Sequence, residues 1–233
     1  MMNAVLALKA QLAQDSRRPY LARGARVERC AQCCLPLRLC LCQYRPTLQS
    51  RLQFGLLMHH NEPFKPSNTG KLICDVLPET AAFEWHRTEP AAGLEQWFST
   101  GNTRIVFPRH YVAAQRLTPL PETGPVKLLI LDGTWQQARK MLRTSRYLDA
   151  LPVTSIDEPL LSAYQLRQQY RDGHLCTAEV AALLLQQAGE NANSSLLSAW
   201  LQTFSEHYLA AKRQRLPAER ALTTLAALLK AQD

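Results

Sequence analysis

The chain has 233 residues, of which 46% are hydrophobic and 20% charged, and its 27 Lys and Arg against 19 Asp and Glu give a net charge of +8. This composition is typical of a globular protein and excludes disorder, collagen-like sequence and a bundle of membrane helices. No stretch approaches the roughly 18 apolar residues of a spanning helix, and the first residues lack a signal-peptide layout, so we expect a soluble cytoplasmic protein. The excess of cations favours a polyanionic partner, although solubility alone would also account for it.

The first 50 residues differ from the rest of the chain. Apolar residues recur at helical spacing over 2–15, and five arginines follow over 17–29. Five of the seven cysteines come next, between positions 30 and 42. We therefore predict a small N-terminal segment, 1–50, ahead of one larger domain over 51–233.

The cysteine cluster has the spacing of a metal site. Two residues separate Cys30 from Cys33 and one separates Cys40 from Cys42, so four thiolates are available for the tetrahedral sulfur shell that Zn²⁺ prefers. Thiols of a cytosolic chain stay reduced, which favours structural zinc over two disulfides. Free or redox-active thiols and an iron–sulfur cluster are the alternatives, and Cys34 could replace Cys33 as a ligand. Four protein ligands leave no open coordination position, so we assign this site to folding and RNA docking and not to chemistry.

From position 51 onward, short apolar runs alternate with amphipathic helical stretches. Three runs predict strands: 52–58, 103–107 and 126–131. Helices are predicted from about position 70 and after Thr134, and this alternation is typical of an α/β domain with a largely parallel sheet and flanking helices. The last third predicts helices over 177–188 and 195–215 and a final helix with an apolar stripe, which would cover the sheet.

One acidic residue directly follows the predicted strand that ends at Leu131. It opens the tetrapeptide Asp132-Gly133-Thr134-Trp135, which lies between that strand and a predicted helix. Open α/β sheets bind ligands at this position, where Gly133 permits close approach and the free amides of the helix start attract anionic groups. The alternative is purely structural: Asp132 or Thr134 caps the helix and Trp135 packs in the core.

The tetrapeptide Asp132-Gly133-Thr134-Trp135 resembles the signature of the DTW-domain family, the tRNA-uridine aminocarboxypropyltransferases, and the likeness is to the bacterial members in particular. Further motifs match in the expected order, which makes the resemblance much more specific than the tetrapeptide. These motifs are the cluster Cys30/Cys33/Cys40/Cys42 with Pro36, Glu62-Pro63, the segment from Ser67 to Leu72, Phe107-Pro108, the segment from Ala138 to Met141, Ser162-x-Tyr164-x-x-Arg167, and Thr177-Ala178-Glu179.

The resemblance implies an enzyme that uses S-adenosylmethionine and is related to the SPOUT superfamily, with an α/β fold and a deep C-terminal trefoil knot. It implies transfer of the 3-amino-3-carboxypropyl group to N3 of a tRNA uridine, with release of methylthioadenosine. The sulfonium is already an activated electrophile, so the transfer itself requires no metal. Asp132 is the candidate catalytic residue, either as the base that takes the N3 proton or as the group that orients the methionine part of the cofactor.

The resemblance also suggests two groups of binding residues. The first would bind S-adenosylmethionine: Phe107, Pro108, Leu131, Asp132, Gly133, Thr134, Trp135, Leu161 and Ser162. The second would bind the tRNA: Glu62, Asn68, Thr69, Arg109, Arg139, Lys140 and Arg167. Asn68 and Thr69 also suit an ordinary helix N-cap, and each cation taken singly suits a solvated surface charge.

Two other functions fit the same sequence. A SPOUT-like RNA methyltransferase would use the same cofactor but transfer its methyl group. A zinc-containing RNA-binding protein would bind RNA without catalysis. The sequence leaves open which uridine and which tRNAs are modified, and whether the chain is a monomer or an oligomer.

Overall fold

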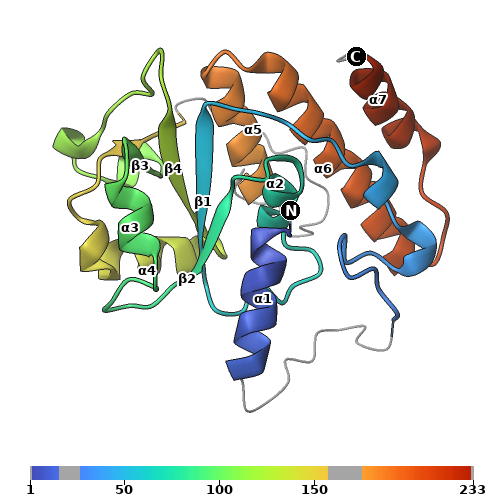
Figure 1. Ribbon diagram of the computed structural model, residues 1–233, viewed down its shortest axis with the longest axis horizontal. Helices are drawn as coiled ribbons and strands as arrows, with labels where there is room; N and C mark the ends of the chain where they lie inside the picture. Colours follow the sequence, from blue (N-terminus) through green and yellow to red (C-terminus); the bar gives the residue numbers. More distant parts are fainter. Residues whose placement is uncertain (1, 16–26, 157–174, 232–233) are drawn as a thin grey trace.

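The computed structural model describes residues 2–15, 27–156 and 175–231, and these contain one five-stranded sheet (Figure 1). All strand pairs are parallel, and the order across the sheet is β2-β1-β4-β3-β5. The strands are β1 (Leu52–Met58), β2 (Ala81–Glu84), β3 (Thr103–Val106), β4 (Val126–Asp132) and β5 (Val153–Thr154). The predicted α/β class with a parallel sheet is confirmed.

The connections diverge between the two long central strands. The chain leaves β1 for β2 on one side of the sheet, and it leaves β4 for β5 on the other. In the register of this pair, Met58 lies opposite Asp132, so both strands end at the same level. Open parallel sheets bind ligands in the crevice that forms where strand order reverses in this way. Asp132 therefore lies at the topological switch point.

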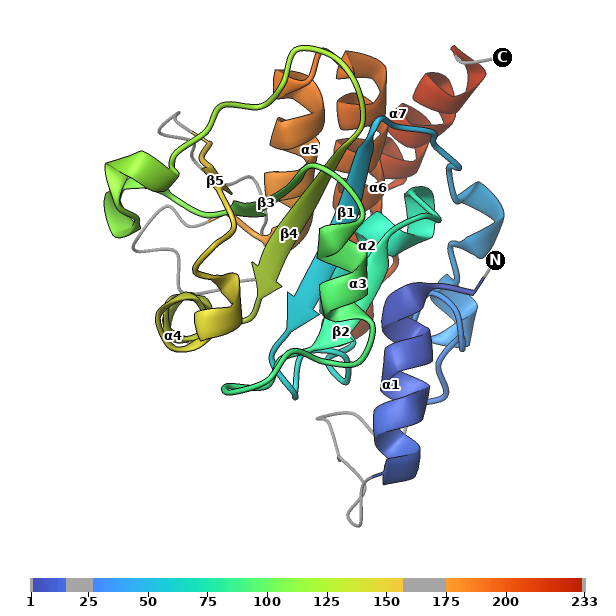
Figure 2. The same cartoon turned by 60° about the vertical axis from the view of Figure 1, so that its left-hand side comes forward.

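Helices cover both faces of the sheet (Figures 1 and 2). The helices are α1 (Ala4–Asp15), α2 (Gly70–Val76), α3 (Leu94–Ser99), α4 (Trp135–Thr144), α5 (Thr177–Gln187), α6 (Asn191–Lys212) and α7 (Glu219–Lys230). Residues of α2, α5 and α6 share one hydrophobic core with the sheet, and residues of α3 and α4 share a second core on the opposite face. The predicted flanking helices are thus present on both sides.

The alternation of side chains along β4 decides which way Asp132 faces. Leu128 and Ile130 belong to the core under α2, α5 and α6, whereas Leu129 and Leu131 belong to the core under α4. Successive strand residues point to opposite faces, so Asp132 continues the set of Leu128 and Ile130. Its carboxylate consequently faces the layer of α2 and α5.

The N-terminal residues pack against the larger domain. Val5 and Cys33 are fully buried in the same core as β1 and α6. The Asn3 amide donates hydrogen bonds to the Lys71 carbonyl and to Asp75 Oδ1, both at 2.8 Å. Figure 1 accordingly shows α1 lying alongside α2 and β2.

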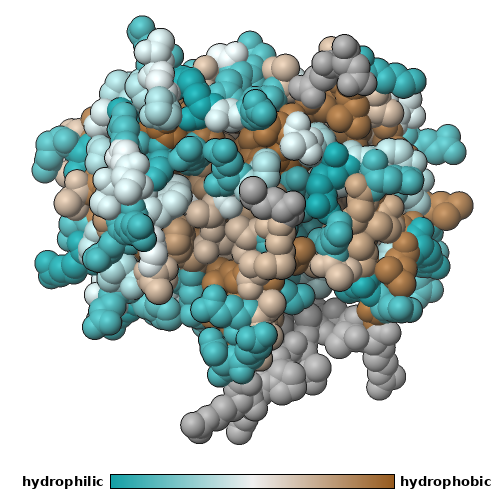
Figure 3. Space-filling model, viewed as in Figure 1, coloured by the Kyte–Doolittle hydropathy of each residue, from teal (hydrophilic) through white to brown (hydrophobic). Residues whose placement is uncertain are grey.

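The surface carries few large exposed hydrophobic side chains. In the described ranges they are Met2, Val27, Leu37, Tyr111 and Leu216. On the face shown in Figure 3, hydrophobic residues form patches between hydrophilic ones. Of the helices in these ranges, none combines the length and the apolar character that crossing a bilayer requires.

Candidate active site and metal centre

The carboxylate of Asp132 is buried and held at both oxygens. Its residue exposes only 3% of its surface. Oδ2 accepts a hydrogen bond from Asn68 Nδ2 at 2.7 Å, and Oδ1 accepts one from Thr177 Oγ1 at 2.5 Å. A buried carboxylate needs such partners, because an unpaired charge in the interior is strongly unfavourable. The three side chains form a polar cluster, which we call the Asp132 cluster.

Two helix starts supply the partners of Asp132. Asn68 lies two residues before α2, and Thr177 is the first residue of α5. The Asn68 side-chain oxygen accepts a hydrogen bond from the Lys71 amide at 3.0 Å, which leaves its NH₂ group directed at the carboxylate. The positive ends of both helices add to this, since helix N-termini favour nearby negative charge.

Gly70 allows α2 to approach this carboxylate closely. A Cβ atom at position 70 would lie 3.0 Å from Asp132 Oδ2 and 3.3 Å from Asn68 Oδ1. Such contacts are tighter than van der Waals packing normally allows, so a side chain here would displace the carboxylate or the amide. The glycine is therefore required by the geometry of the Asp132 cluster.

The turn after Asp132 is fixed by a capping box. Thr134 Oγ1 accepts a hydrogen bond from the Gln137 amide, and Gln137 Oε1 accepts one from the Thr134 amide at 2.8 Å. This reciprocal pair is the expected start of a helix, so the predicted N-cap at Thr134 is confirmed. A side chain at Gly133 would approach Gln137 Cβ to 3.1 Å. The capping box therefore requires a small residue at position 133.

His59 lies next to Asp132, at the edge of the sheet where β1 and β4 end. Its amide donates to the Asp132 carbonyl at 2.9 Å, and its Nδ1 lies 3.3 Å from Gln137 Nε2. The ring stacks on Trp85 with centroids 5.6 Å apart. Burial, followed by the neighbouring charge of His60, lowers the pKa of His59 below its usual value of 6.5. His59 is consequently neutral at pH 7.

Three aromatic rings pack together beyond the tetrapeptide. Trp135 stacks on Phe107 with centroids 5.5 Å apart and meets Tyr111 edge-on at 5.1 Å. These are the offset and T-shaped arrangements that aromatic rings prefer. Trp135 thus links the carboxyl end of β4 to the segment after β3. Leu131, by contrast, is buried in the core under α4, so its side chain is directed away from solvent.

Other residues that the sequence predicts at the site form separate contacts of their own. Glu62 is buried and forms an ion pair with Lys65. Thr69 is buried and shares a hydrogen bond with the Cys176 thiol. The backbone amide of Arg109 donates to Ser155 Oγ at 3.0 Å, and Pro108 precedes it on the exposed surface. Three predicted residues lie outside the described residues: Leu161, Ser162 and Arg167.

Two isolated cysteines near the core are unreactive. Burial raises the pKa of the Cys74 thiol to about 12 and that of the Cys176 thiol to about 12. Only a thiolate acts as a strong nucleophile, and neither group ionises at neutral pH. Their burial and raised pKa values are typical of structural cysteines and not of nucleophiles.

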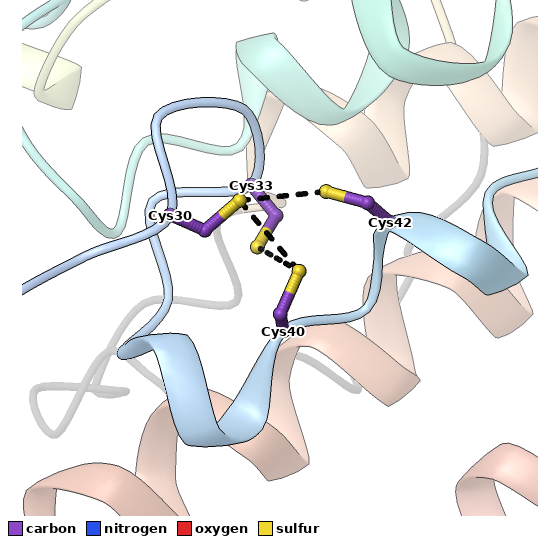
Figure 4. Close-up of side chains that lie close together, drawn as sticks. All are labelled: Cys30, Cys33, Cys40 and Cys42. Carbon is purple, nitrogen blue, oxygen red and sulfur yellow. Dashed lines mark hydrogen bonds between the residues drawn. The ribbon is translucent and has the colours of Figure 1, made fainter.

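The four predicted metal ligands converge on one point (Figure 4). The sulfur atoms of Cys30, Cys33, Cys40 and Cys42 all lie within 4.8 Å of one another. Cys40 is 3.6 Å from Cys30 and 3.9 Å from Cys33, and Cys42 is 3.6 Å from Cys30. A zinc tetrahedron with Zn–S bonds of about 2.3 Å has edges of about 3.8 Å, so the spacing suits Zn²⁺. Cys34 has a positive φ of 62° and is absent from this group.

Hydrogen bonds favour ionisation of the Cys30 thiol, whereas burial raises the pKa values of the Cys33 and Cys42 thiols. Burial opposes ionisation of Cys30, but the backbone amides of Cys33 and Gln32, together with the Cys40 and Cys42 side chains, lower its pKa to about 7. The guanidinium of Arg45 lies 3.5 Å from Cys42 Sγ. A bound metal ion would displace the protons of the remaining thiols, so the donor set of four cysteine sulfurs fits zinc.

A buried lysine connects the four-cysteine cluster to the Asp132 cluster. Lys71 exposes 2% of its surface, donates to the Cys33 carbonyl at 2.9 Å, and places its ammonium 3.9 Å from the centre of the Phe204 ring. The same residue uses its backbone amide to orient Asn68. Lys71 therefore joins the cysteine loop to the residue that holds Asp132.

The sequence predicts both Asp132 and Asn68 at the site, but not the hydrogen bonds that join Asp132 to Asn68 and Thr177. Thr177 belongs to a matching motif that carries no assigned role, and the sequence places Gly70 near the site, beside Asn68 and Thr69, without predicting its contact with Asp132. Gly70 and Thr177 could have been found from their positions, because each is the first residue of a helix whose N-terminus faces the sheet edge. Tyr111 had no signal, because a single tyrosine in a loop is uninformative.

Comparisons with known proteins identify the family of this chain. Residues 27–209 match the DTW domain family. Three relatives are named tRNA-uridine aminocarboxypropyltransferase 2: those of Drosophila melanogaster, 27% identical over 69% of this chain, Mus musculus, 26% over 67%, and Macaca fascicularis, 25% over 67%. The match spans 66% of the fly protein and 55% of each of the other two. No solved structure matches significantly. Because the family match covers well over half of its residues, the chain belongs to the DTW domain family.

Proposed function

We propose that this chain transfers the 3-amino-3-carboxypropyl group of S-adenosylmethionine to N3 of a uridine in tRNA. The observation that carries the proposal is the DTW match over residues 27–209, together with the names of the relatives. The Asp132 cluster supports it, because the family tetrapeptide begins at the topological switch point of the sheet, where ligands bind.

Asp132 orients the methionine part of the cofactor in this proposal. When bound, S-adenosylmethionine supplies a sulfonium whose neighbouring carbon is already electrophilic. Asn68 and Thr177 occupy one lone pair on each carboxylate oxygen and fix the plane of the group. A carboxylate held in this way is suited to binding an ammonium group in one direction, which selects the carbon that faces N3. We therefore favour orientation of the cofactor as the role of Asp132 over its alternative role as the base that takes the N3 proton.

The cofactor pocket would be built from the segments that follow β3 and β4. Phe107, Pro108, Gly133, Thr134 and Trp135 lie there, and Trp135 already stacks on Phe107. The backbone of Leu131 contributes to this edge while its side chain packs in the core. The trefoil knot and the roles of Leu161 and Ser162 stay predictions of the resemblance.

The N-terminal cluster would hold a structural zinc ion. Four cysteine ligands at tetrahedral spacing leave no position for substrate, so the metal would organise the loop and not react. The tRNA would meet the protein through cations such as Arg109, Arg139 and Lys140, which are exposed near the site.

The decisive experiment supplies the enzyme with two forms of the cofactor, one labelled in its methyl group and one in its carboxyl group. We expect label to enter tRNA only from the carboxyl-labelled form, with methylthioadenosine as the second product. Label from the methyl group alone would replace the proposal with a methyltransferase. Absence of both would favour a zinc-containing RNA-binding protein.

The variant Asp132→Asn distinguishes a role of Asp132 in transfer from a role in folding. The amide keeps the size of the carboxylate but loses its charge, so transfer should fall by at least about 100-fold, the scale expected for misplaced reacting groups. Thermal unfolding and tRNA binding should change little. Exposed Asp15→Asn at the end of α1 serves as the matched control, and full transfer by Asp132→Asn would reject the assigned role.

A further inference from the structure

A second cleft lies beside the Asp132 cluster, on the α4 face of the sheet. Its volume is about 530 Å³, and it is bounded by the segment after β3 and by the outer side of α4. Aromatic and cationic side chains dominate its lining: Phe107, Tyr111, Arg116, Arg139, Lys140 and Arg143. The proposed function uses three of these residues, Phe107, Arg139 and Lys140, but it assigns no ligand to the cleft that they form with the others.

The cations of α4 form no salt bridge with any acidic residue that the structure describes. The helix carries Arg139, Lys140 and Arg143 and no Asp or Glu. No salt bridge within residues 2–15, 27–156 and 175–231 involves any of the three, although Asp149 also lines the cleft. Like charges four residues apart on a helix are mutually destabilising, as for Arg139 and Arg143. Such a helix face is suited to an anionic ligand.

Tyr111 provides a flat and rigid platform at the mouth of this cleft. It is 45% exposed, although it is a large aromatic residue. Trp135 packs against Tyr111 at an interplanar angle of 76°, and the Arg139 guanidinium lies over one face of the Tyr111 ring, 4.8 Å from its centre. A partly exposed aromatic ring beside cations is an arrangement with which proteins bind single-stranded nucleic acid, because every base can stack and every phosphate is negative.

Arg116 forms part of the wall and not of the binding surface. Its guanidinium donates to the carbonyls of Leu148 and Leu151 at 2.8 and 2.9 Å. These bonds join the segment after β3 to the segment after α4. The two sides of the cleft are therefore fastened together, and its shape is preformed before any ligand binds.

We propose that this cleft binds a nucleotide of the RNA substrate next to the reacting uridine, with its base on Tyr111 and its phosphates near Lys140 and Arg143. The inference rests on the proposed function. Trp135 contacts Tyr111 and belongs to the tetrapeptide that begins at Asp132, so the cleft adjoins the proposed site of transfer. S-adenosylmethionine itself is a poor occupant, because its sulfonium and ammonium outnumber its one carboxylate and the cleft is cationic.

The test measures binding of fluorescently labelled bulk tRNA by anisotropy, without cofactor and over a range of salt concentrations. Tyr111→Ala should weaken binding by about 5- to 150-fold, the range for loss of one stacked base, whereas Tyr111→Phe should keep wild-type affinity. Arg143→Ala should reduce the slope of log affinity against log salt by roughly 0.7–0.9. Arg220→Ala on α7 is the matched control, because it removes an equally exposed arginine from a helix remote from the cleft.

Two results would overturn the inference. Tyr111→Ala with wild-type affinity for tRNA would exclude stacking, provided that its thermal unfolding is unchanged. Tyr111→Ala that loses binding of S-adenosylmethionine in calorimetry, but keeps binding of tRNA, would identify the cleft as the cofactor site. Failure of the proposed reaction is distinguishable, since wild-type protein would then bind tRNA through Tyr111 without transferring label.

Discussion

Substitution of Gly70 by alanine tests how tightly the Asp132 cluster is built. The new methyl group would lie 3.0 Å from Asp132 Oδ2, 3.1 Å from Leu56 Cδ1 and 3.3 Å from Asn68 Oδ1. Each neighbour must move by several tenths of an ångström to restore normal contact. All three groups belong to buried side chains, so the carboxylate and the amide must take up part of this displacement together with Leu56.

The expected loss of stability is modest. Inserting a methyl group into a packed interior costs about 1–3 kcal/mol, while alanine is favoured over glycine in a helix by up to about 1 kcal/mol. The free energy of unfolding should therefore fall by about 0–2 kcal/mol. For a chain of this length, that corresponds to a decrease in Tm of up to about 8 °C.

Transfer should fall as well. Because a misplacement of 1 Å reduces turnover by about 100-fold, a shift of a few tenths of an ångström should reduce it by roughly 5-fold. Thermal unfolding and incorporation of carboxyl-labelled cofactor into tRNA should therefore be measured on the same preparation. Gly93→Ala is the matched control: Gly93 has a φ of 78°, so alanine is strained by about 1–2 kcal/mol, but no atom within 4 Å would meet its Cβ. Wild-type turnover by Gly70→Ala, or equal losses in both variants, would refute the reasoning.

Three further predictions concern the metal, a histidine and the second core. Cys40→Ser should lose bound zinc, measured by elemental analysis, and should lower solubility; a wild-type protein that is free of metal yet fully folded would contradict a structural site. Because the folded pKa of His59 lies below 6.5, the unfolded chain binds more protons between the two pKa values, and stability falls as pH drops below about 6.5. His59→Gln should flatten this part of the plot of Tm against pH, and an unchanged plot would exclude the contribution. Gly55→Ala would place a Cβ 2.5 Å from Trp97 Cη2 and should destabilise the fold by about 1–3 kcal/mol in urea denaturation; partial recovery in Gly55→Ala/Trp97→Leu would identify the clash as the cause, and wild-type stability of Gly55→Ala would contradict it.

The strands that the sequence predicted are those buried on both faces. The predicted run 52–58 coincides with β1, and the runs 103–107 and 126–131 agree with β3 and β4 to within one residue. Two strands had no such signal: all four residues of β2 are half-buried, and β5 has only two residues. Short edge strands owe their existence to pairing with a neighbour, which periodicity does not reveal.

The candidate site shows the same division between local and long-range causes. Asp132 was predicted because a strand end and a helix start are both visible in the local sequence. Its bond to Thr177 depends on the packing of α5 against the sheet, 45 residues further along the chain. The link through Lys71 to the Cys33 carbonyl spans 38 residues and likewise has no local signal. The choice of Cys33 over Cys34 required the positions of the sulfur atoms.

Nucleoside mass spectrometry of tRNA tests the proposed function most directly. Total tRNA would be digested from cells that contain this chain, from cells that lack it, and from cells that express Asp132→Asn. The account predicts uridine carrying an aminocarboxypropyl group only where the intact chain is present. Equal amounts of that nucleoside in all three samples would contradict it.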